Sequence, residues 1–134
     1  MLEESMVATT PDLKNEQQLA PLAARYVVTD ELPWRPTRWE GIRMKVLMED
    51  KESGLLTALM EWDAGTKLPL HEHVRIEQTY VLRGSLADEE GVATAGNFVW
   101  RPQGSQHVAS APDGALILAF FLQPNRFFGS EASN

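Results

Sequence analysis

Short β-prone runs, each ended by a turn signal, recur along most of this chain. From Tyr26 onward, Gly, Pro, Asp or Asn interrupts these runs about every eight to fifteen residues. Such spacing, with no helical pattern between the runs, is typical of an all-β sandwich or barrel and disfavours a βαβ fold. The predicted strands are, in chain order, 25–29, 42–49, 55–62, 77–82, 92–95, 97–101, 106–111 and 115–122.

The predicted strands divide the chain into one barrel with two flanking segments. A length of 134 residues suits a single domain. The sequence predicts an N-terminal lead-in over 1–24, a β-barrel over 25–123 and a C-terminal tail over 124–134. Within the lead-in, Asp12 could cap a short helix that runs to about Arg25.

Composition excludes several functional classes. The net charge of −7 argues against a nucleic-acid partner. The longest apolar run, 115–122, is far shorter than the ~20 residues that cross a bilayer as a helix. The first residues carry no secretory pattern, which favours a cytoplasmic protein. Because the chain has no cysteine, any transition metal must be bound by imidazole and carboxylate groups.

The chain has three histidines, and their spacing suggests a shared site. His71 and His73 lie two residues apart in an extended stretch, so their side chains project from the same face. Glu77 has the same parity, and a bend near 74–76 would bring its carboxylate beside them. His107 follows the turn over 102–105, and a closed sheet could bring it to the same interior point.

Three imidazoles and one carboxylate fit zinc, iron, nickel, manganese or copper, whereas calcium prefers an all-oxygen site. Four protein ligands leave two open positions on an octahedral ion. On tetrahedral zinc they leave none, which favours a structural or sensing role. The sequence alone keeps both coordination modes open.

Two segments resemble the paired motifs of the cupin superfamily. Residues 65–84 match every fixed position of the first motif, G(X)5HXH(X)3-4E(X)6G, and residues 96–111 match four of the five fixed positions of the second, with Ala111 in place of the usual Asn. The resemblance implies an RmlC-like jelly-roll β-barrel. It also implies that His71, His73, Glu77 and His107 bind one divalent transition metal ion per chain, iron or zinc before nickel or manganese.

Within the superfamily, the sequence most resembles the ChrR-like branch. This resemblance depends on Trp34-Arg-Pro36 and on the stretches over 80–91 and 101–107. The branch includes zinc-binding anti-sigma-factor domains, and iron dioxygenases that cleave diketones and hydroxyketones lie nearby. The resemblance also implies a homodimer, with an N-terminal strand crossing to the partner. Apolar residues that would suit such an interface are Leu118, Phe121, Phe127 and Phe128.

Three functional hypotheses follow from these patterns. The first is a metal-dependent dioxygenase of the Fe(II) type that acts on a small carbonyl or hydroxy compound, with Glu77 as fourth ligand or base. The second is a ChrR-like zinc-binding sensor or regulatory module without turnover. The third is a metal-dependent isomerase or decarboxylase, because one fold hosts many chemistries.

Other polar and charged residues have simpler predicted roles. Arg35 and Arg101 could anchor an anionic substrate, but solvated or ion-paired roles are the more common ones. The acidic run Asp88-Glu89-Glu90 is predicted to form a solvent-facing turn rather than a second metal site.

Overall fold

The computed structural model describes residues 8–128, so the outer ends of the predicted lead-in and tail lie outside the described residues. The described chain is all-β, with two short 3-10 turns, η1 (Glu16–Gln18) and η2 (Thr29–Glu31). Its strands are β1 (Arg35–Pro36), β2 (Ile42–Asp50), β3 (Leu55–Trp62), β4 (Thr66–Glu72), β5 (Glu77–Ala87), β6 (Val92–Thr94), β7 (Phe98–Arg101), β8 (Gln106–Ala111), β9 (Ala115–Phe121) and β10 (Arg126–Phe127).

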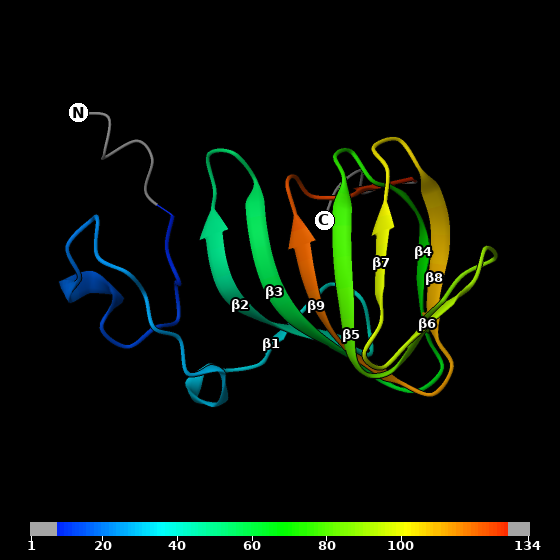
Figure 1. Ribbon diagram of the computed structural model, residues 1–134, viewed down its shortest axis with the longest axis horizontal. Helices are drawn as coiled ribbons and strands as arrows, with labels where there is room; N and C mark the ends of the chain where they lie inside the picture. The colour runs from blue at the N-terminus through cyan, green and yellow to red at the C-terminus, as the bar shows by residue number, and fades with distance from the viewer. Residues whose placement is uncertain (1–7, 129–134) are drawn as a thin grey trace.

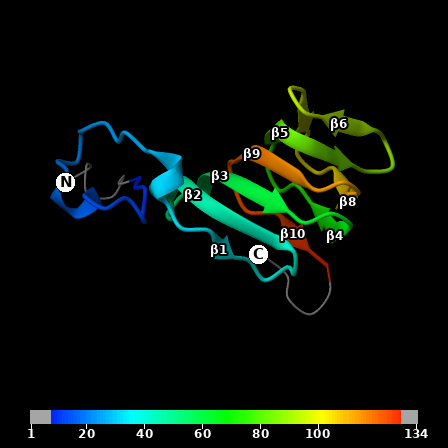
Figure 2. The ribbon, with the colours of Figure 1, turned by 90° about the horizontal axis from the view of Figure 1, so that it is seen from below.

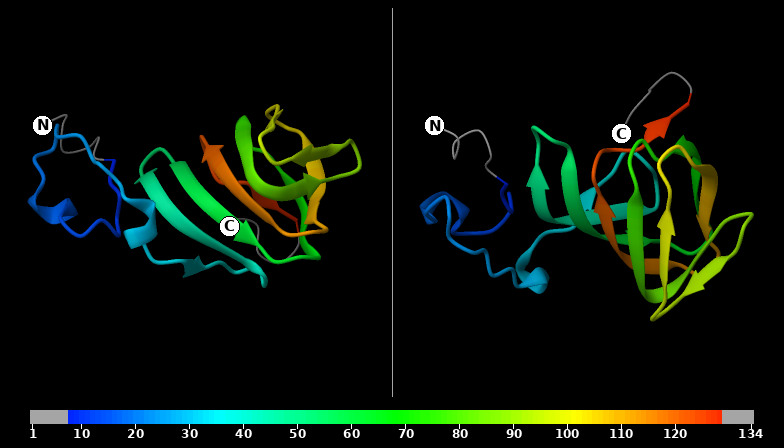
Figure 3. Two further views of the ribbon diagram at one scale, coloured as in Figure 1. Left: turned by 60° about the horizontal axis from the view of Figure 1, so that its bottom comes forward. Right: turned by 45° about the horizontal axis from the view of Figure 1, so that its top comes forward.

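The strands form one strongly curled antiparallel sheet. Its order is β1-β2-β3-β9-β5-β8-β4-β10, with β6 and β7 also paired to β5. Figure 1 shows β2, β3, β9, β5 and β7 on one side and β4 and β8 on the other, and Figures 2 and 3 show how the sheet curls into a half-barrel. Strands far apart in sequence therefore face one another across a shared interior.

The interior is lined by alternate residues of the strands, because side chains in a strand alternate between faces. In β9, for example, Ala115, Ile117, Ala119 and Phe121 are buried, while the residues between them are more exposed. These side chains join Ile42, Trp62, Val81 and Phe127 in one core cluster. Small alanines leave room for larger side chains to meet across the barrel.

Four glycines at fixed positions of the two motifs adopt a backbone conformation that favours glycine. Gly65, Gly84, Gly96 and Gly104 all have positive φ, from 75° to 90°. At Gly84 the requirement is also steric, because a Cβ there would collide with the carbonyl oxygen of Gly114. Glycine therefore allows β5 to pass close to the turn that precedes β9.

The predicted helix and first strand were wrong. Only the three-residue turn η1 forms in the segment from Asp12 to Arg25, and no strand covers 25–29. Instead of capping a helix, the Asp12 carboxylate accepts hydrogen bonds from the Arg35 guanidinium, with Oδ2 at 2.7 Å from Nε. A tertiary ion pair thus takes the place of the local cap.

In the structure the lead-in extends to the start of β1, and its described residues, 8–34, lie beside β2, outside the half-barrel (Figures 1 and 2). The backbones of Thr9 and Glu49 form a reciprocal pair of N–H···O hydrogen bonds. Lys45 of β2 donates a hydrogen bond from Nζ to the carbonyl oxygen of Thr29 at 2.8 Å. Leu22 and Tyr26 of this segment are 90% and 87% exposed. Among the described residues, no helix is long and apolar enough to cross a bilayer.

Candidate metal centre

The structure brings the three histidines together inside the half-barrel. Strands β4 and β8 pair antiparallel with His71 directly opposite His107, and His73 follows the end of β4. The register shifts between Leu68 and His71, which marks a β-bulge or a similar irregularity in the ladder. The three rings are 1%, 0% and 5% exposed for His71, His73 and His107.

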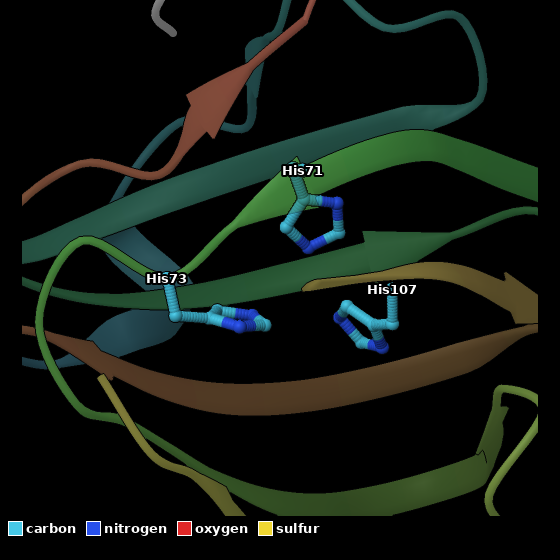
Figure 4. A group of neighbouring side chains, drawn as sticks. All are labelled: His71, His73 and His107. Atoms are coloured by element: carbon cyan, nitrogen blue, oxygen red, sulfur yellow. The ribbon is translucent and has the colours of Figure 1, made fainter. Parts of the chain in front are cut away.

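The three rings point toward a common centre (Figure 4). Their centroids are 4.5 Å apart for His71 and His107, 4.9 Å for His73 and His107, and 5.0 Å for His71 and His73. One donor nitrogen from each ring lies within 4.8 Å of the others. The structure thus brings His107 and the closely spaced pair His71 and His73 to one interior point.

Each imidazole is oriented by an oxygen at Nδ1. The Nδ1 of His71 lies 2.8 Å from the carbonyl of Pro69, and that of His73 lies 3.1 Å from the carbonyl of Ser105 and 3.0 Å from its Oγ. The Nδ1 of His107 lies 2.8 Å from Oδ2 of Asp88. These acceptors place the ring proton on Nδ1, which leaves each Nε2 lone pair for a ligand.

The donor set fits a divalent transition metal ion. Nε2 of His73 is buried and has no hydrogen-bond partner among the described residues, as expected of a nitrogen whose lone pair serves a metal. Burial lowers the pKa of His71 to about 4 and also lowers the pKa of His107. Both rings therefore stay neutral at physiological pH, which is the form that binds metals.

Glu77, the predicted fourth ligand, lies at the edge of this cluster. It is the first residue of β5, and its Oε1 lies 2.8 Å from Nε2 of His73. That short distance is a close polar contact rather than an aligned hydrogen bond, because the same nitrogen has no hydrogen-bond partner. The group of converging donors comprises the histidines without Glu77, so ligation by Glu77 stays a prediction.

The structure corrects the prediction that the acidic run at Asp88 faces solvent. The turn forms as predicted, with Oδ1 of Asp88 accepting hydrogen bonds from the backbone N–H of Glu90 and Gly91. The Asp88 side chain, however, is only 2% exposed, and its Oδ2 lies 2.8 Å from His107 Nδ1 and 2.7 Å from Arg101 Nη1. The carboxylate therefore faces the site instead of solvent.

The charge of Asp88 is maintained by its partners. Burial by itself raises the pKa of this carboxyl, but hydrogen bonds from His107, Glu90 and Gly91 and the positive charge of Arg101 together lower it below 3.8. The sequence did not indicate this role of Asp88 because its partner His107 is 19 positions away. Only the pairing of β5 with β8 brings them together.

A cavity of about 200 Å³ adjoins the histidines. Its volume is below the roughly 300–1,000 Å³ of sites for drug-sized ligands, so it suits a small molecule. Most of its walls are apolar, and its ionisable lining residues are His71, His107, Glu77 and Arg101. Arg35, the other arginine considered as an anchor, pairs with Asp12 and does not line this cavity.

Comparisons with known proteins agree with the fold and the site. The family model described as the ChrR cupin-like domain matches residues 23–125. A candidate acetylacetone dioxygenase from Methylibium petroleiphilum PM1 is 25% identical, with a TM-score of 0.75 over 84% of this chain and 88% of that one. A search of curated protein sequences gave no match.

Two further solved structures are informative. The acetylacetone dioxygenase from Acinetobacter johnsonii is 22% identical, with a TM-score of 0.71 over 84% of this chain and 85% of that one, which supports the fold alone. In the complex of Rhodobacter sphaeroides SigE with the anti-sigma ChrR, a chain is 25% identical, with a TM-score of 0.60 over 69% of this chain and 51% of that one.

Proposed function

This chain belongs to the family of ChrR cupin-like domains, and we propose that it is a metal-dependent dioxygenase of the Fe(II) type that acts on a small carbonyl or hydroxy compound. The observation that carries the proposal is the convergence of three buried imidazoles at the edge of a cavity. Three or four protein donors leave open positions on a six-coordinate ion, a feature of non-haem iron oxygenases. The similarity to a candidate acetylacetone dioxygenase supports the same reaction class.

The chain's own residues supply orientation, exclusion of water and a proton acceptor. His71, His73 and His107 would hold the ion, and a bound ferrous ion would supply the redox chemistry that dioxygen requires. The apolar walls, including Ile117 and Phe121, exclude bulk water from the cavity. Glu77, which lines the same cavity, would be the fourth ligand or the base that accepts a substrate proton.

Oxygen consumption tests this proposal. Protein reconstituted with Fe(II) is mixed with a panel of small diketones, hydroxyketones and oxo acids in an oxygen-electrode assay. We expect uptake with at least one class of compound and no uptake by a His71→Ala variant. Absence of uptake across the panel in protein that holds iron would overturn the proposal. Conversion of a compound without oxygen consumption would instead favour an isomerase or decarboxylase.

A zinc-binding sensor is the second candidate. Two observations favour it: the match to the ChrR cupin-like family and the position of Glu77 Oε1, 2.8 Å from His73 Nε2, which could complete a closed shell of four ligands. Metal analysis separates the two candidates. Stoichiometric zinc in the protein as isolated, with four protein ligands by X-ray absorption and no turnover, would favour the sensor.

We also propose that two copies of the chain associate through the outer face of the sheet. This face carries four exposed aromatic residues on β5, β7 and β9, namely Tyr80, Phe98, Trp100 and Phe120. The lead-in exposes further apolar side chains that its own barrel does not cover, Leu22 and Tyr26. A second copy is the occupant we favour, because one chain carries two separate exposed apolar surfaces that could pair between copies.

The structure changes the list of interface residues expected from sequence. Phe121 and Phe127 are buried and line the cavity, so they are not available to a partner. Leu118 lies on the outer face, paired with Tyr80, and Phe128 is partly exposed. The aromatic face of β5 and β7 replaces the two buried phenylalanines in the proposed interface.

A further inference from the structure

Two residues that line the cavity beside the histidines carry buried hydrogen-bond donors without a partner among the described residues. Trp62 is 4% exposed, and its Nε1–H has no partner among the described residues. The same holds for the buried Nε1 of Trp39, and both residues line the cavity. A buried donor without an acceptor costs about 1–3 kcal/mol, so these donors favour a ligand rich in acceptor oxygens.

Arg101 adds a positive charge to the same lining. Its side chain is 13% exposed, and one of its nitrogens, Nη1, lies 2.7 Å from Oδ2 of Asp88. A guanidinium carries five N–H donors in a planar fork, so a single carboxylate oxygen leaves most of them for another acceptor. Because Arg101 lines the cavity, that acceptor can be a bound substrate.

The charges around the cavity do not cancel when a divalent ion is present. Glu77 and Asp88 contribute two carboxylates, and Arg101 contributes one guanidinium. With a divalent ion at the histidines, the ion, the guanidinium and the two carboxylates together carry a net charge of one positive unit. Uncompensated charge in a poorly hydrated site is costly, and a ligand with a single negative charge would neutralise it.

We infer that Arg101 binds the carboxylate of the substrate, which is therefore a small carbonyl compound with one negative charge, an oxo acid rather than a neutral diketone. This inference rests on the proposed function for the carbonyl part of the substrate and extends it by the anionic group. Arg101 would hold that group through charge-assisted hydrogen bonds. The rest of the molecule would contact apolar walls such as Leu68 and Ile117.

Binding of two probes of similar shape tests this inference without turnover. Zinc-loaded protein is titrated with 2-oxobutanoate and with 2,3-pentanedione, which replaces the carboxylate by an acetyl group, in an isothermal titration calorimeter. We expect the wild type to bind the oxo acid at least about 10-fold more tightly, the effect of a hydrogen bond between charged groups. Equal affinities for the two probes would overturn the inference.

Variants assign the preference to Arg101. We expect Arg101→Met to abolish it and Arg101→Lys to keep part of it, because lysine retains the charge without the fork. Arg43→Met is the matched control, since Arg43 pairs with Glu61 and Asp63 away from the cavity, and it should keep the full preference. A preference that persists in Arg101→Met would assign the selectivity to the metal and overturn the inference.

The design separates this inference from the proposed function. Because Arg101→Met leaves Asp88 without its cation, the double variant Arg101→Met with Asp88→Asn provides a second test in which both charges are removed. Metal content measured on each variant shows whether the histidines still hold zinc. Tight binding of the oxo acid without oxygen uptake by the iron form would overturn only the dioxygenase proposal. Oxygen uptake with neutral diketones, with no Arg101-dependent preference for the oxo acid, would overturn only this inference.

Discussion

Where β5 begins and β7 ends, the two faces of the sheet differ from those of an ordinary half-exposed sheet. Such sheets place apolar residues inside and polar residues outside. Here Glu77 and Arg101 line the interior cavity, whereas Tyr80, Phe98 and Trp100 are exposed on the outer face. This end of β5 and β7 thus carries ionisable groups inward and aromatic groups outward, while the rest of the inner face is the apolar core.

We interpret these two faces as serving different functions. Burying imidazoles and carboxylates costs free energy that packing alone would not require, and the proposed metal and substrate would account for that cost. Exposed aromatic residues gathered on one surface favour association with another molecule. If this comparison is correct, changes on the inner face should affect metal and ligand binding, and changes on the outer face should affect assembly.

The largest effect is expected from removing two of the proposed metal ligands in the interior. A protein with both His71→Ala and His107→Ala should lose at least about 100-fold in metal affinity, because outer-shell groups alone contribute 10–100-fold. Metal analysis after dialysis measures this directly. His73→Ala should behave similarly, since His73 contributes the third converging nitrogen. Unaltered metal content in the double variant would contradict the proposed site.

The next effect is a dependence of stability on pH in the metal-free protein. Burial lowers the pKa of His71 from 6.5 to about 4, so the unfolded chain binds more protons than the folded chain between these values. Stability should therefore fall as the pH decreases from about 6.5 to about 4, by up to about 3 kcal/mol. The lowered pKa of His107 acts in the same direction.

Urea denaturation at a series of pH values measures this dependence. A His71→Gln variant is the control, because it lacks the titrating group and should show a shallower loss of stability over the same range. An identical pH dependence in the variant and the wild type would mean that His71 does not carry the effect.

A smaller effect is expected from Asp88, which contacts a proposed ligand but does not join the cluster of donors. Asp88→Asn should weaken metal binding about 10–100-fold, because it removes the charged acceptor that orients His107. Competition with a chelator measures this affinity. The neighbouring exposed Glu89→Gln is the control and should leave it unchanged. Equal affinities for the two variants would show that Asp88 has no positioning role.

Asp88 also shows where sequence reasoning stops. The turn at Asp88 was predictable from its residues, but the direction of its carboxylate depends on strand pairing across the barrel. The histidines were predictable because an i, i+2 spacing in an extended segment fixes a common face. No comparable local rule connects Asp88 with His107 or Arg101, so their contacts emerge only in three dimensions.

The strands also differ in how far nearby residues in the sequence predict them. β3 and β8 have the predicted bounds, 55–62 and 106–111, because turn residues flank both. β4 was missing from the predicted strands because it contains Pro69, which argues against a regular strand. The proline lies where the pairing with β8 shifts register, between Leu68 and His71. An irregular ladder there tolerates the missing N–H of the proline.

The smallest effect on stability, and the test of the outer face, is expected from Trp100→Ser. Trp100 is 55% exposed, so its replacement should change the free energy of unfolding by no more than about 0.5 kcal/mol. If the outer face joins two copies, the same variant should nevertheless shift the protein toward monomer in sedimentation-velocity experiments. Val92→Ser, an exposed apolar site on β6, is the matched control and should leave assembly unaltered.

The combination of results decides what the aromatic face is for. A dimeric wild type that Trp100→Ser dissociates, while metal content and oxo-acid binding stay the same, would separate assembly on the outer face from chemistry on the inner one. A monomeric wild type would exclude the paired copy as the occupant. A dimer that Trp100→Ser does not dissociate would place the interface elsewhere. The variant Tyr26→Ser would then test whether the lead-in forms the contact, since Tyr26 is 87% exposed.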